Sequence, residues 1–121
     1  MATEEDVRRI ALSLPATDEH PSYGGRPSFR VNKKGFLHIR EDRESIGITV
    51  ADLAEKEALL KSDERKFFTT PHYDGYASVL VRYRTVDVDE LRELITDAWR
   101  IKAPKRVLAA FEKAESQARP R

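Results

Sequence analysis

The segment at residues 67–83 reads FFTTPHYDGYASVLVRY, and it joins a loop rich in aromatic residues to an apolar run. Pro71 fixes φ and lacks a backbone donor, and Asp74-Gly75 is a typical turn pair, so a loop is predicted up to Tyr76. The apolar residues that follow predict a strand from Ala77 to Tyr83. Rings held at the mouth of a strand can either close a core or contact a ligand, because binding residues often lie on loops.

Three further strands are predicted before this loop. They run from Ser28 to Val31, from Phe36 to Arg40 and from Ser45 to Val50, and the last has the clearest alternation of apolar and polar residues. The residues Asn32-Lys33-Lys34-Gly35 predict a four-residue hairpin loop between the first two strands, with Gly35 at a position of positive φ. Such a loop would project two lysines into solvent.

Four helices are predicted from capping residues and from apolar residues spaced for one helical face. The predicted helices run from Glu4 to Leu14, from Asp52 to about Lys61, from Asp87 through Trp99, and from Pro104 onwards. The second has only a thin apolar face, whereas Trp99 in the third is predicted to be a core residue. In the fourth helix, the residues predicted to face the core are Val107, Ala110, Phe111 and Ala114.

The order of these elements predicts an α+β fold with two layers, in which helices pack on a mostly antiparallel sheet. The length of 121 residues fits one domain, predicted at residues 1–115, with a frayed tail at 116–121. The chain has no cysteine and no long apolar segment, which excludes a disulfide framework and a cysteine nucleophile and favours a cytoplasmic protein away from the membrane.

Several separated motifs resemble the MmcQ/YjbR-like family of small bacterial proteins. The motifs are Leu14-Pro15, the run PSYGGRPSFRV at residues 21–31, Gly35-Phe36, and the segments 67–83 and 87–99. The resemblance spans about Val7 to Phe111. It implies a secretion-chaperone-like (YjbR-like) α+β fold and a DNA-binding protein with a double-wing arrangement of strands. It implies neither an enzymatic activity nor a cofactor.

The net charge is only +1, so an interaction with nucleic acid must depend on how the charges are distributed. Cations gather on the predicted hairpin and its strands, where a two-stranded ribbon would fit the major groove of duplex DNA, and aromatic rings can stack on bases. The candidate nucleic-acid-binding residues are Arg26, Arg30, Lys33, Lys34, Arg40, Arg43, His72, Tyr73 and Tyr76. The alternative interpretation is that the cations keep a sheet edge soluble and the rings close the core.

Other classes of function have weaker signals. The three histidines, His20, His38 and His72, lack the spacing of a metal site, and no serine lies in a nucleophile motif, so no enzyme, metal or cofactor is predicted. A protein-interaction module using an open sheet face or edge is the alternative function, with another protein as the partner. A small-ligand pocket between the aromatic loop and the turn at Tyr23-Gly24 is a third possibility.

Overall fold

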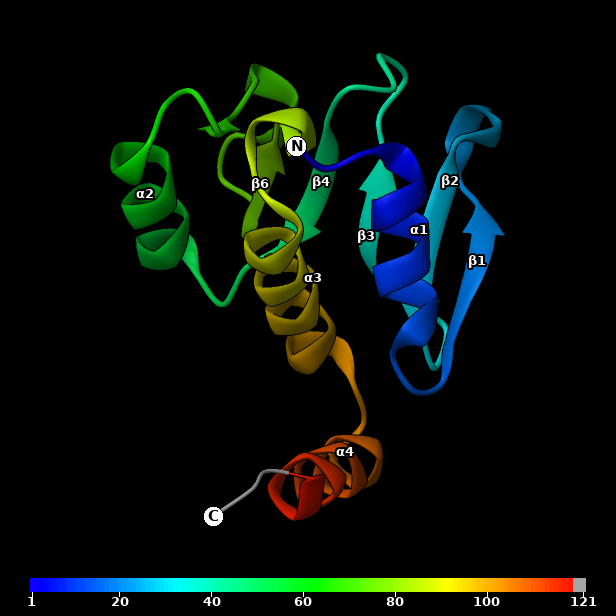
Figure 1. The fold of residues 1–121 in the computed structure, drawn as a ribbon. Coiled ribbons are helices and arrows are strands. Elements are labelled where there is room, and N and C mark those ends of the chain that lie inside the picture. The colour runs from blue at the N-terminus through cyan, green and yellow to red at the C-terminus, as the bar shows by residue number, and fades with distance from the viewer. Residues whose placement is uncertain (119–121) are drawn as a thin grey trace.

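The computed structural model describes residues 1–118 and consists of one six-stranded sheet, four α-helices and three short 3-10 turns (Figure 1). The helices are α1 (Glu4–Ser13), α2 (Leu53–Ser62), α3 (Val88–Lys102) and α4 (Lys105–Ala118). The strands are β1 (Thr17–Pro21), β2 (Pro27–Val31), β3 (Lys34–Ile39), β4 (Ile46–Thr49), β5 (Phe67–Phe68) and β6 (Ser78–Val81). The turns are η1 (Tyr23–Gly25), η2 (Pro71–Tyr73) and η3 (Tyr83–Thr85).

The strands lie in the order β1-β2-β3-β4-β6-β5, and each strand is antiparallel to its neighbours. The predicted α+β class is therefore confirmed. Within residues 1–118, none of the helices combines the length and the apolar character that crossing a membrane requires.

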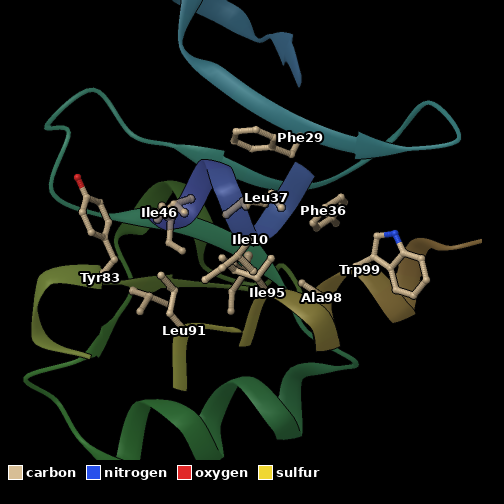
Figure 2. Packing of buried hydrophobic residues seen from close by; sticks show 14 of the residues in the cluster. Ile10, Phe29, Phe36, Leu37, Ile46, Tyr83, Leu91, Ile95, Ala98 and Trp99 are labelled. Carbon is tan, nitrogen blue, oxygen red and sulfur yellow. The ribbon is translucent and has the colours of Figure 1, made fainter. Parts of the chain in front are cut away.

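One face of the sheet is covered by α1 and α3, and the main core lies in this layer (Figures 1 and 2). The register aligns Leu37, Ile48 and Val79 on this face, because the three are cross-strand partners. Helix α3 buries Leu91, Ile95, Ala98 and Trp99 completely. The Trp99 indole nitrogen donates a hydrogen bond to the Pro15 carbonyl over 3.0 Å, which confirms its predicted place in the core.

The opposite face of the sheet, called the open face below, carries no long helix. His38, Gly47 and Leu80 are cross-strand neighbours on this face, and Phe68 of β5 lies beside Leu80. The loop at residues 69–77 reaches this face, because the Tyr73 hydroxyl lies 3.0 Å from His38 Nε2. The open face is therefore a mixed polar and aromatic surface.

The hairpin and the aromatic segment differ locally from the sequence-based expectation. The hairpin between β2 and β3 closes with a two-residue turn, since Val31 pairs with Lys34, and the positive φ angles belong to Asn32 (49°) and Lys33 (70°) and not to Gly35. Positive φ at both turn residues matches the twist of antiparallel strands. The aromatic segment also begins as a strand, because Phe67 and Phe68 pair with Val81 and Leu80 of β6.

Helix α4 packs against the end of α3, through an edge-to-face contact of Phe111 with Trp99 at 4.8 Å between ring centroids. Val107 and Phe111 are half-buried, whereas Ala110 and Ala114 are exposed, so the prediction that all four face the core is wrong for the two alanines. The helix lies at one end of the molecule, where the sheet does not reach it (Figure 1). It continues to Ala118, three residues into the segment predicted as a frayed tail, and residues 119–121 lie outside the described part of the chain.

Candidate nucleic-acid interface and the open face of the sheet

The two lysines of the hairpin are exposed cations at its tip. Lys33 and Lys34 are exposed at the tip between β2 and β3, and neither forms an ion pair with any residue in the range 1–118. The turn conformation at Asn32 and Lys33 makes this tip tight. Two positive charges therefore face solvent at a protruding point.

The four predicted arginines are all paired with carboxylates. Each partner comes from another segment or a nearby turn: Arg26 pairs with Glu41, Arg30 with Asp18 over 2.9 Å, Arg40 with Asp42 over 3.2 Å, and Arg43 with Glu4 over 2.6 Å. Their charge is largely compensated. The sequence alone could not show this, because Glu4 stands 39 residues before Arg43 and α1 must fold onto the sheet to bring them together.

The hairpin tip lies at the same end of the molecule as the junction between α3 and α4. The backbone nitrogen of Asn32 donates to the Ala16 carbonyl over 3.4 Å, and the adjacent Pro15 carbonyl accepts the hydrogen bond from Trp99. Figure 1 shows the β2–β3 turn and α4 toward the same end. Three further cations without ion pairs within residues 1–118 follow Trp99. The group called the basic end below is Lys33, Lys34, Lys102, Lys105 and Arg106.

The aromatic loop precedes β6 and also lies toward this end. Strands β3 and β6 run in the same direction, because both are antiparallel to β4, so the segments that precede them are at the same end of the sheet. Tyr76 is 66% exposed and His72 is exposed, whereas Tyr73 is half-buried. The His72 ring meets the Tyr73 ring edge-on at 5.1 Å. Two of the three predicted rings are therefore accessible.

Lys56 holds the aromatic loop in place. Its side chain is buried, with 6% of the residue exposed, and its amine donates to the carbonyls of Tyr73 (2.6 Å) and Tyr76 (3.0 Å). Sequence reasoning missed this residue, since a lysine on a polar helix is normally solvated. The thin apolar face predicted for α2 is the one signal in the sequence that the helix is attached to the rest of the protein by something other than apolar packing.

His38 is the central side chain of the open face. Its ring stacks with Tyr73 at 6.0 Å between centroids and 11° between planes, and it lies against Gly47, where an added Cβ would be 2.8 Å from Nε2. Burial lowers the pKa of His38 below its ordinary value, and the positive charges of Arg26 and Arg40 lower it further. The imidazole is therefore neutral at pH 7, so it does not add to the positive charge of the surface.

A cavity of about 380 Å³ opens on this face beside His38. It lies between the η1 turn and β6, and none of its lining residues belongs to the loop at residues 69–77, so it differs from the pocket between the aromatic loop and the turn at Tyr23-Gly24 that is the third possibility from the sequence. The polar side chains that line it are those of Ser22, Arg26, Ser28, His38, Thr49 and Ser78.

The other end of the open face has a cation and aromatic cluster. The Arg82 guanidinium lies 4.0 Å from the centroid of the Phe68 ring, and that of Arg40 lies 5.6 Å from it. Phe68 is half-buried under these two arginines. In the part of the chain from Met1 to Ala118, no group of three or more histidines and carboxylates is arranged to hold a metal ion.

Comparisons with known proteins assign the chain to a family. The family model described as YjbR matches residues 12–101. Uncharacterised proteins of Mycobacterium bovis and Mycobacterium tuberculosis are 38% identical over 128 residues, covering 92% of this chain and 96% of each relative. A crystal structure of a Deinococcus radiodurans protein with a DUF419 domain has a similar fold, with a TM-score of 0.72, 22% identity, and 96% and 89% coverage of the two chains. The chain therefore belongs to the YjbR family.

Proposed function

We propose that this protein binds double-stranded DNA through the basic end, and that Lys33 and Lys34 make the principal phosphate contacts. The supporting observation is how the cations are paired. The four arginines on or next to the strands have carboxylate partners, whereas the hairpin lysines have none among residues 1–118. A phosphate can therefore approach the lysines without displacing an acidic side chain.

The shape of the hairpin supports the same proposal. A two-stranded antiparallel ribbon is narrow enough to enter a major groove, and its tip here is a two-residue turn. Lys102, Lys105 and Arg106 on the helical side offer a second set of cations for the neighbouring backbone. The exposed rings of His72 and Tyr76 lie toward the same end and are accessible for contact with the DNA.

The proposed binding is electrostatic, sequence-independent and not enzymatic. Among residues 1–118, the His38 ring forms its hydrogen bond with the phenol of Tyr73 and not with a serine or threonine hydroxyl, which supports a binding role over a catalytic one. A net charge of +1 favours modest affinity, in the range of about 10⁻⁴ to 10⁻⁶ M that is usual for non-specific complexes. We place this role in the cytoplasm, where bacterial DNA is accessible.

The proposal can be tested by fluorescence anisotropy with a labelled duplex at several salt concentrations. The double variant Lys33→Glu/Lys34→Glu should weaken binding and flatten the slope of log K against log salt by about one unit for each phosphate that the protein no longer binds. The matched control is Lys61→Glu/Arg92→Glu, which makes the same change in net charge on exposed residues of α2 and α3. Equal weakening in both variants, or no binding of the wild type at low salt, contradicts the proposal.

The alternative of a protein partner added to a sheet edge has less structural support. Strand β1 forms one edge, but its exposed residues include Asp18, Glu19 and His20, and it ends at Pro21. Strand β5 at the other edge has only two residues. Charge, proline and shortness are the features that keep edge strands from pairing with another chain.

A further inference from the structure

We infer that the cavity beside His38 on the open face is a binding site for a small hydroxylated monoanion, with Arg26 as the group that recognises the negative charge. The site is separate from the basic end, since none of the five residues that define the basic end lines it. Its volume of about 380 Å³ is within the range of sites for small ligands.

The walls of the cavity come from segments that are far apart in the sequence. Ser22 and Arg26 flank the η1 turn, Ser28 lies on β2, and Thr49 and Ser78 are cross-strand partners on β4 and β6. Gly47 forms part of the floor, and its missing side chain leaves the room that the His38 ring occupies. The Tyr73 phenol holds this ring through the hydrogen bond to Nε2. The cavity is therefore bounded by rigid sheet and by a histidine that is fixed in orientation.

The hydroxyl groups of the cavity present oxygen acceptors. Ser22 donates its proton to the Arg26 carbonyl over 2.9 Å, Ser28 to the His20 carbonyl over 2.5 Å, and Ser78 to the Ile48 carbonyl over 3.2 Å. Because each hydroxyl proton already has an acceptor, these oxygens offer lone pairs to a ligand. A ligand that carries several hydroxyl donors matches this arrangement.

The cavity has one positively charged side chain, which favours a ligand with a single negative charge. Arg26 is the only charged side chain of its lining, since His38 is kept neutral and no carboxylate of the described residues lines it. The Arg26 side chain is 31% exposed, and its partner Glu41 is 66% exposed and lies outside the lining. Exposed ion pairs are weak, so a ligand carboxylate can take the place of Glu41. One cation fits a monoanion better than a dianion.

The test is a titration of the full-length protein followed by amide chemical shifts in two-dimensional NMR. The probes are gluconate as a hydroxylated carboxylate, glucose 6-phosphate as a phosphate ester, and glucose as the neutral control, each up to about 10 mM, which detects dissociation constants in the millimolar range. Gluconate should shift the amides of Ser28, His38, Gly47 and Thr49, and glucose should not. If glucose 6-phosphate binds tighter than gluconate, the single-charge assignment is wrong.

Two variants and one control test which residues bind the ligand. Arg26→Gln should weaken gluconate binding by about tenfold or more, as expected when a charge-assisted hydrogen bond is removed. Arg30→Gln is the matched control, because Arg30 is also a half-buried arginine with a carboxylate partner on this face but does not line the cavity. Thr49→Leu, which fills the cavity from a half-buried position, should abolish binding while the protein remains folded.

Three results would overturn the inference: no shift with any probe, shifts confined to Lys33 and Lys34, or equal affinity in Arg26→Gln and wild type. The first and third results do not bear on DNA binding by the basic end, which Lys33→Glu/Lys34→Glu tests separately, whereas shifts confined to Lys33 and Lys34 would mean that the anion binds at the basic end.

Discussion

At the scale of single residues, the contact between His38 and Gly47 determines how the open face is built. The imidazole lies so close to β4 that a Cβ at residue 47 would be 2.8 Å from Nε2 and 2.9 Å from Nδ1, and closer still to Cε1. Glycine is needed here for space and not for an unusual φ angle. A glycine inside the strand pattern Ile46-Gly47-Ile48 indicates that some group approaches closely, but only the register identifies that group as His38.

Replacing Gly47 with alanine should therefore displace the His38 ring and weaken its hydrogen bond to Tyr73. We expect the free energy of unfolding to fall by roughly 1–3 kcal/mol, which is typical when a side chain is forced into a packed site. Urea denaturation measures the change. In the His38→Ala background the same substitution should cost much less, because the ring that it meets is gone. An equal cost in both backgrounds would show that something other than His38 excludes the methyl group.

At the scale of elements, α2 and the aromatic loop depend on each other through Lys56. Helix α2 has no fully buried apolar residue, and Lys56 is its only buried residue. The lysine amine adds a hydrogen bond to two loop carbonyls, at Tyr73 and Tyr76, each of which also accepts one from a nearby backbone amide. The loop then presents Tyr73 to His38, so a contact made by a helix at the side of the sheet fixes a ring on its open face.

Substituting Lys56 with methionine keeps most of the side-chain volume but removes both hydrogen bonds. We expect a decrease of about 1–3 kcal/mol in the free energy of unfolding, as for the loss of hydrogen bonds made by a charged group. Hydrogen exchange at the amides of residues 73–78 should become faster than in wild type. Lys61→Met is the control, because Lys61 is an exposed lysine of the same helix. Unchanged exchange in Lys56→Met would mean that the loop is held by other contacts.

The helices and strands also differ in how well they could be predicted from the sequence. Helices with clear caps were predictable, since the Thr3 side chain accepts from the Asp6 nitrogen and the Asp87 side chain from the Glu90 nitrogen, as the local sequence suggests. Strand β1 was missed because TDEHP has no apolar alternation, and the strand exists through its backbone pairing with β2. In the candidate site, the lysines at the hairpin tip were predictable from a local turn. The carboxylates that neutralise Arg30 and Arg43 were not, because tertiary structure brings them there.

At the scale of the whole molecule, contacts within turns and between elements give several groups pKa values that favour the folded protein at neutral pH. Hydrogen bonds from Arg43 hold the pKa of Glu4 below its ordinary value, although partial burial opposes this, and the pair joins α1 to the segment between β3 and β4. Burial acts to raise the pKa of the Asp42 carboxyl, but hydrogen bonds from Glu44 and Ser45 outweigh burial, so the pKa is lowered. Burial lowers the pKa of His38. All three shifts make the folded protein bind protons less readily than the unfolded chain.

The sign of the pH dependence follows from these directions. Where the unfolded chain binds more protons than the folded protein, the free energy of unfolding rises with pH. The contribution of His38 is therefore fully present above the ordinary histidine pKa of about 6.5 and is lost as pH falls below it. Carboxylate contributions are lost in a lower range, below about pH 4.5. Stability should thus decline with acid in two separable stages.

Urea denaturation at closely spaced pH values between about 4 and 8 should resolve the first stage through His38→Gln, because glutamine does not titrate in the range where histidine does. This variant is expected to lose the decline that begins as pH falls below about 6.5, while keeping the carboxylate stage at lower pH. His72→Gln is the matched control, since His72 is exposed and its ring meets Tyr73 only edge-on. Its curve should follow that of the wild type. A decline in His38→Gln as steep as in wild type would place the titrating group elsewhere, and the open face would then not contribute to the decrease of stability in mild acid.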